Sequence, residues 1–120
     1  MTNEEAYALG RRLVACKGFR PMRGMRDMQG GTWKQSELFR WWHDHHTPDL
    51  TDPATLGCLL HLVREAWGDE CVCALPVDYG PGGVAWFCRL TAGGRDLARS
   101  YLRGGVGEAE ALVAALEAAP

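Results

Sequence analysis

Clusters of histidine and cysteine are the first side chains in this sequence that could do chemistry. His43, His45 and His46 stand almost together, and a single residue separates Cys71 from Cys73. Imidazole and thiolate are the ligands that zinc prefers in four-coordinate sites. Neither cluster has the ligand spacing of a zinc finger, and alternate residues of a strand point to opposite faces. We therefore predict no metal site and no cofactor, and a zinc-dependent enzyme is kept as an alternative.

The five cysteines could also serve thiol chemistry. Their number is odd and their spacing matches no disulfide framework, which favours reduced thiols in a cytoplasmic protein. A nucleophilic cysteine needs a neighbouring base and a lowered pKa, and no spacing in the sequence pairs a cysteine with a histidine. The serine-hydrolase, phosphate-loop, metalloprotease and dinucleotide-binding motifs are absent. We predict that the protein is not an enzyme, with a thiol-dependent enzyme as an alternative.

Arginine recurs at every third position after the first predicted helix. Arg20, Arg23 and Arg26 are interspersed with one phenylalanine and two methionines. Residues 1–40 hold eight Lys and Arg against four Asp and Glu, although the whole chain has a net charge of −2. A basic edge beside an aromatic residue suits phosphate contacts, so a nucleic-acid- or nucleotide-binding module using the basic segment from Arg11 to Arg26 is an alternative function.

Tryptophan is frequent, with five residues in a chain of 120. Trp67 and Trp86 fit the predicted core, whereas Trp41 and Trp42 stand beside the polar histidine loop. Tryptophan and arginine are enriched at the energetic centres of protein interfaces. We therefore predict a partner-binding surface in the irregular part of the chain, made of Arg20, Arg23, Arg26, Trp41, Trp42, His43 and His45.

The central helix, predicted over residues 50–68, positions its neighbours and has the clearest signals. Asp52 is a good N-cap, Pro53 suits the first helical position, and Gly68 can end the helix in the left-handed conformation. Its apolar residues cover roughly 200° of the helical wheel, about twice the width of one packing face. We expect two buried faces, the first on the sheet and the second against a neighbouring helix or a second copy of the chain in a homodimer. The apolar residues are Thr55, Leu56, Cys58, Leu59, Leu60, Leu62, Val63, Ala66 and Trp67.

The remaining elements follow from caps and periodicity. Thr2 and Glu5 form a capping box for a helix over residues 3–16, and a last helix is predicted over residues 108–119. β-rich runs around a glycine-rich turn predict a hairpin, whereas the segment at residues 96–102 fits either a short helix or an extended stretch. Residues 19–31 are predicted as an irregular edge segment, counted as a weak strand, with a returning weak strand at 32–42. The hairpin pair is predicted at 70–77 and 84–90.

These elements give the order α-β-β-α-β-β-α in one α+β domain that covers residues 1–120. We expect a small antiparallel sheet of about four strands, packed with helices in a layered sandwich. The apolar runs are too short to cross a bilayer, and the acidic first residues lead into a helix rather than a signal peptide. The predicted location is therefore cytoplasmic.

Four stretches carry a resemblance to a known family, at residues 9–16, 48–60, 63–67 and 107–116. They resemble small phage and prophage proteins with the layout called the phage ABA sandwich domain, in which helices lie on either side of a small sheet. The resemblance brings no catalytic motif and therefore no functional residue. It implies a phage accessory protein in the host cytoplasm that binds and inhibits or modulates a host protein, for instance as an anti-defence, anti-CRISPR-like inhibitor.

Overall fold

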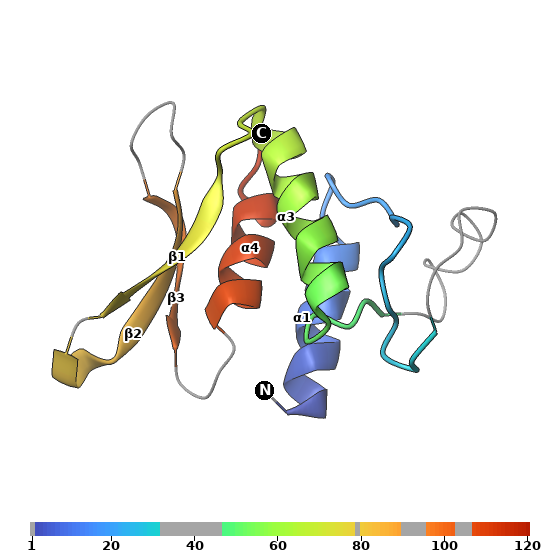
Figure 1. Ribbon diagram of the computed structural model, residues 1–120, viewed down its shortest axis with the longest axis horizontal. Coiled ribbons are helices and arrows are strands. Elements are labelled where there is room, and N and C mark those ends of the chain that lie inside the picture. The colour runs from blue at the N-terminus through green and yellow to red at the C-terminus, as the bar shows by residue number, and fades with distance from the viewer. Residues whose placement is uncertain (1, 32–46, 79, 90–95, 103–106) are drawn as a thin grey trace.

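The computed structural model describes residues 2–31, 47–78, 80–89, 96–102 and 107–120, the third strand by its backbone alone (Figure 1). Helices and antiparallel strands are both present, as the predicted α+β class requires. The described elements, in chain order, are α1 (Asn3–Val14), α3 (Pro53–Trp67), β1 (Cys73–Asp78), the short 3-10 turn η2 (Gly80–Gly82), β2 (Val84–Arg89), β3 (Asp96–Leu102) and α4 (Gly107–Glu117).

Both predicted helix starts are confirmed at the level of hydrogen bonds. The hydroxyl of Thr2 accepts from the amide of Glu5 at 3.1 Å, which begins α1. The Asp52 carboxylate accepts from the amide of Thr55 at 3.0 Å, which begins α3. Gly68 ends α3 with a φ of 63°, a left-handed conformation that residues with a Cβ rarely adopt.

The sheet is an antiparallel meander in the order β1-β2-β3. The predicted hairpin is confirmed, with Cys73 opposite Arg89 and Asp78 opposite Val84. The segment that fitted either a helix or an extended stretch is the third strand, because it pairs with β2 along its length. Pairing with β2, a non-local interaction, therefore determines the conformation of a segment whose local pattern fits both a helix and a strand.

The weak edge strand predicted over residues 19–31 is wrong. Within the part of the chain that the structure describes, this segment consists of turns and irregular backbone, with an isolated bridge between Asp27 and Pro48. Pro21 has no amide hydrogen for a ladder, and Gly24 turns the chain with a φ of 98°. The returning strand predicted over residues 32–42 lies outside the described residues.

Helix α4 lies between the sheet and the pair α1 and α3 (Figure 1). All the described helices lie on one side of the sheet, so the expected arrangement with helices on either side is not found in this part of the chain. The alanines of α4 allow the neighbouring layers to approach this helix closely. The buried residues of α4 are Gly107, Ala109, Ala111, Leu112, Val113, Ala115 and Leu116.

Helix α3 was expected to bury one face on the sheet, but α4 lies between α3 and the sheet, so this expectation is wrong. Among the described residues, α3 buries one continuous side. The buried residues are Thr55, Leu59, Leu62 and Val63, which pack toward α4 and the segment after α1. The other flank of the predicted apolar arc, at Leu56, Leu60 and Trp67, is only partly buried. The helix with two buried sides is α4, whose alanine-rich sequence gave a weaker signal than the leucines of α3.

Candidate functional site

The arginine segment, residues 19–31, is held against α1 and α3 by its buried side chains. Met25 is completely buried in the core. The amide of Arg26 donates to the hydroxyl of Thr55 at 2.8 Å, and that hydroxyl donates to the Asp52 carboxylate at 3.0 Å. The N-cap of α3 therefore also fixes the backbone of the arginine segment.

Backbone bonds to residues 47–49 hold the same segment from its other side. The amide of Met28 donates to the carbonyl of Thr47 at 2.8 Å, and the amide of Asp49 donates to the carbonyl of Arg26 at 2.7 Å. The buried carboxylate of Asp27 accepts from two backbone amides, at Gln29 and Gly31. This irregular stretch is thus ordered without belonging to the sheet.

The three arginines of the predicted surface do not share one environment. Arg20 forms two hydrogen bonds with Glu65 of α3, the shorter of 2.7 Å, and this contact holds the pKa of Glu65 below its usual value. Arg23 and Arg26 are exposed, and neither forms an ion pair with a carboxylate within the part of the chain that the structure describes. The candidate site is therefore centred on Arg23 and Arg26, with Arg20 as a support.

The rest of the predicted partner-binding surface cannot be placed. Trp41, Trp42, His43 and His45 fall outside the described residues, as does His46 of the histidine cluster. Their assignment stays a prediction from the sequence. Cys71 is exposed and Cys73 is half-buried, and the described residues contain no group of three or more side chains that could hold a metal.

The basic stretch before the arginine segment is also partly neutralised. Arg12 of α1 makes an ion pair of 2.6 Å with Glu117 and a longer one of 3.8 Å with Glu110, both on α4. These bonds join helices that are about a hundred residues apart in the sequence. Arg11 and Lys17 remain exposed at other points of the surface.

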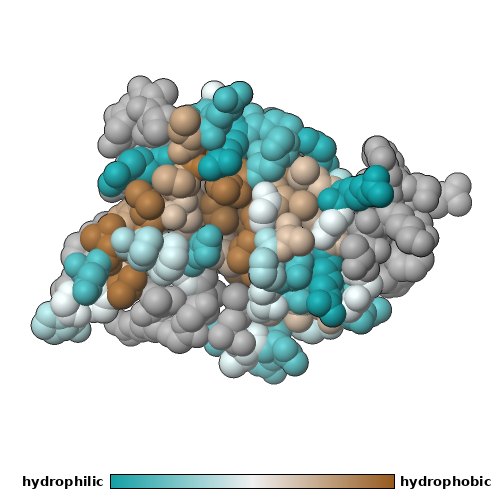
Figure 2. All heavy atoms as spheres, viewed as in Figure 1, coloured by the Kyte–Doolittle hydropathy of each residue, from teal (hydrophilic) through white to brown (hydrophobic). Residues whose placement is uncertain are grey.

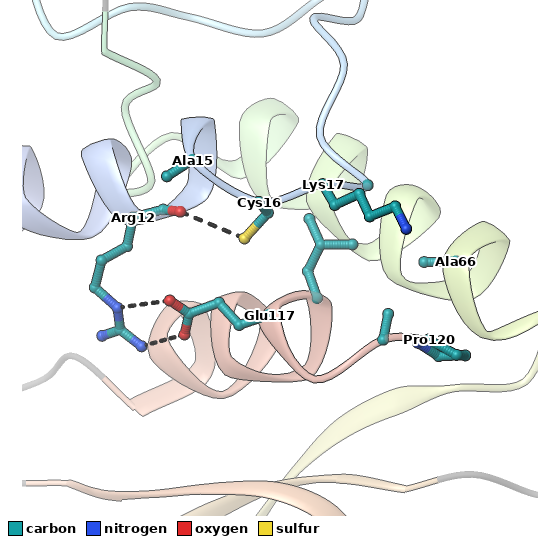
Figure 3. Close-up of a pocket in the computed structure, with 10 residues that line it drawn as sticks. Arg12, Ala15, Cys16, Lys17, Ala66, Glu117 and Pro120 are labelled. Carbon is teal, nitrogen blue, oxygen red and sulfur yellow. Dashed lines mark hydrogen bonds and ion pairs between the residues drawn. The ribbon is translucent and has the colours of Figure 1, made fainter.

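A cleft of about 380 Å³ opens where the C-terminal ends of α1 and α4 meet α3 (Figure 3). Cys16, Lys17, Ala66 and the Arg12–Glu117 pair line it. The thiol of Cys16 donates to the carbonyl of Arg12 at 3.3 Å. No local sequence signal predicts this cleft, because its walls come together only in the fold.

The thiols near these elements are poor nucleophiles. Burial raises the pKa of Cys16 to about 11, with a further contribution from the charge of Glu117. Burial also raises the pKa of Cys88 to about 12 and that of Cys58 above its ordinary value. Reactive cysteines have lowered values because the thiolate is the nucleophile. The pKa of Cys16 is thus shifted in the opposite direction to that of an activated thiol.

No protein-family model, curated protein or solved structure matches the chain. None of the described helices has both the length and the apolar character to cross a membrane. The function is therefore inferred from the geometry of the site.

Replacing Thr55 by valine is expected to lower the free energy of unfolding by about 1–2 kcal/mol. Valine keeps the shape, but it removes the acceptor for the amide of Arg26 and the donor to Asp52. Chemical denaturation measures the loss, and amide hydrogen exchange at Arg26 should become faster. Thr51→Val is the matched control, because its hydroxyl bonds only the exposed Asp49 carboxylate. Equal losses in the two variants would show that Thr55 does not anchor the segment.

Proposed function

We propose that this chain is a non-catalytic accessory protein that binds a host protein and inhibits or redirects it. The proposed setting is the cytoplasm of a phage-infected bacterium, where the protein acts as an anti-defence inhibitor of the anti-CRISPR kind. The single observation that supports binding best is the arginine segment, in which Arg23 and Arg26 are exposed on a backbone fixed by Met25 and Thr55.

A fixed backbone favours binding because less freedom is lost when the partner docks. Association always costs translational, rotational and side-chain freedom, and a preorganised segment lowers that cost. Guanidinium groups form paired hydrogen bonds with carboxylates, which adds geometric specificity to the charge attraction. The partner that this chemistry fits is a protein surface rich in Asp and Glu.

The pairing of the other arginines supports the same choice of residues. Arg12 pairs with a glutamate of α4 and so joins α1 to α4, whereas Arg20 pairs with a glutamate of α3 and joins the arginine segment to that helix. Arg23 and Arg26 lack such contacts among the described residues and are available to a partner. Trp41, Trp42, His43 and His45 are proposed to extend the surface on the strength of the sequence alone.

The proposal is tested by capture from a lysate of the bacterial host with the tagged protein as bait. A defined host protein should be recovered with the unaltered protein and lost with Arg23→Glu/Arg26→Glu. Arg11→Glu/Lys17→Glu is the matched control, since it makes the same change in net charge at exposed positions outside the arginine segment. Equal recovery with both double variants would contradict the proposed surface.

The same variants separate a protein partner from nucleic acid. Binding to nucleic acid releases counterions, so its affinity falls steeply as the salt concentration rises and depends little on the identity of the sequence. We expect no such binding to duplex DNA or to RNA at low salt. Nucleic acid recovered in place of a protein, and lost as the salt concentration rises, would favour the alternative function.

A further inference from the structure

An apolar groove of about 430 Å³ runs along α3 where it faces β1 and α4. Leu56 and Leu60 of α3 are half-buried there, beside Ala74 of β1 and Leu112 of α4. Figure 2 shows hydrophobic residues gathered on this side of the molecule, where the sheet meets the helices. Leu56 and Leu60 belong to the apolar arc of α3 that the sequence predicts, and the described part of the chain leaves this flank of the helix partly uncovered.

Gly57 lies in the middle of α3 at the edge of this groove. A helical glycine costs about 1 kcal/mol relative to alanine. A Cβ at Gly57 would meet no atom within 4 Å, so packing among the described residues does not require a glycine there. Gly10 of α1 is different, because a Cβ there would overlap the side chain of Thr47. The missing side chain at Gly57 therefore leaves room for an approach from outside the chain.

Opposite charges mark the two ends of this flank. The exposed Glu108 lines the groove beside Pro53, at the start of α3. Arg64 lies about 10 Å further along the helix from Gly57, at a rise of about 1.5 Å per residue. Its Nε donates to the carbonyl of Val72 at 2.9 Å, which fixes the guanidinium on the side of β1. One end of the flank thus carries the negative charge of Glu108, and the other end carries the positive charge of Arg64.

We propose that two copies of this chain pair through α3, with the helices antiparallel and crossing at Gly57. A two-fold axis between Gly57 and Leu60 places the C-terminal half of each α3 over the groove of the other copy. Arg64 of each copy then approaches Glu108 of the other, so the charge contact occurs twice. Leu60 of each copy covers the apolar wall formed by Leu56 and Ala74.

A second copy is favoured over an unrelated helix because the flank is complementary to itself. Glu108 and Arg64 lie at opposite ends of the flank, so an antiparallel second copy brings its Arg64 against Glu108 of the first copy and its Glu108 against Arg64. The arginine segment bonds to Thr55 and Cys58 on another flank of α3, so the dimer leaves Arg23 and Arg26 free. This inference is therefore independent of the proposed function, and the two fail separately.

Analytical ultracentrifugation between about 1 and 100 µM, the range of a moderate dimer affinity, tests the pairing. The unaltered protein should sediment as a dimer at the upper end. Gly57→Leu should sediment as a monomer throughout, while its melting temperature at low concentration stays the same or rises because leucine favours the helix. Ala8→Leu, on the exposed side of α1, adds bulk away from the groove and should leave the dimer intact.

The charge contact is tested separately with Glu108→Lys. This variant places like charges opposite each other twice and should raise the dimer dissociation constant by at least about tenfold. If the unaltered protein is still a monomer at 100 µM, roughly the highest dissociation constant of a specific weak dimer, the proposal is overturned. A dimer that persists in Gly57→Leu would overturn it as well, because the helices could not then cross at this residue.

Discussion

Replacing Leu112 by alanine is expected to lower the free energy of unfolding by about 3 kcal/mol, one of the largest losses available to a single side chain here. Leu112 is 1% exposed on α4, the helix that has the sheet on one side and α1 and α3 on the other. The truncation removes contacts with more than one layer, and the cavity cannot collapse without moving an entire element. Equilibrium denaturation followed by tryptophan fluorescence measures the loss.

The matched control is Leu56→Ala on α3, measured at a low protein concentration. Leu56 belongs to the same apolar arc in the sequence as Leu59 but is only partly buried, so its truncation should cost about 1 kcal/mol. A cost for Leu56→Ala equal to that for Leu112→Ala would contradict the assignment of α4 as the central layer.

Gly107→Ala is expected to destabilise the protein by about 3 kcal/mol, through overlap rather than through a cavity. A Cβ at this position would overlap the indole ring of Trp86, whose Nε1 atom is itself buried. The first turn of α4 must then move away from β2. The shift should appear in tryptophan fluorescence as well as in the denaturation midpoint.

Gly57→Ala provides the opposite control for the same substitution. Its Cβ meets no atom within 4 Å, so the variant should gain about 1 kcal/mol as a monomer from helix propensity. If the two substitutions change the free energy of unfolding by the same amount, Gly107 is not in close contact with β2.

The local parts of the fold could be predicted because their signals lie within a few residues. The capping interactions of Thr2 and Asp52 and the left-handed Gly68 fix the ends of two helices without any long-range contact. The hairpin of β1 and β2 also has a local cause, since a glycine-rich turn joins two β-rich runs.

The non-local parts could not be predicted from the sequence pattern. Leu97 and Tyr101 are four apart, which suits a helix, but pairing with β2 makes the segment a strand. The alanines of α4 show no strong amphipathic pattern, because both sides of this helix are covered. Double burial therefore weakened the very signal that would have identified the central helix.

In the candidate site, too, the local features could be predicted and the non-local ones could not. The irregular character of the arginine segment could be predicted, since Pro21 and Gly24 oppose a strand, but its place outside the sheet could not. That Arg20 pairs with a glutamate could not be predicted, because Glu65 is 45 residues from Arg20 in the sequence. Only the fold shows that Arg23 and Arg26 are exposed and form no ion pair with the other described residues.

The affinity of the captured host protein, measured by isothermal titration calorimetry at one fixed salt concentration, tests the central claim most directly. We predict that Arg23→Glu/Arg26→Glu weakens binding by at least about 100-fold, because charged groups at an interface centre contribute several kcal/mol. Arg11→Glu/Lys17→Glu should change the affinity by less than about threefold, as expected for charges outside the interface. An equal loss with both double variants, or no loss with either, would contradict the claim that the arginine segment is the binding surface.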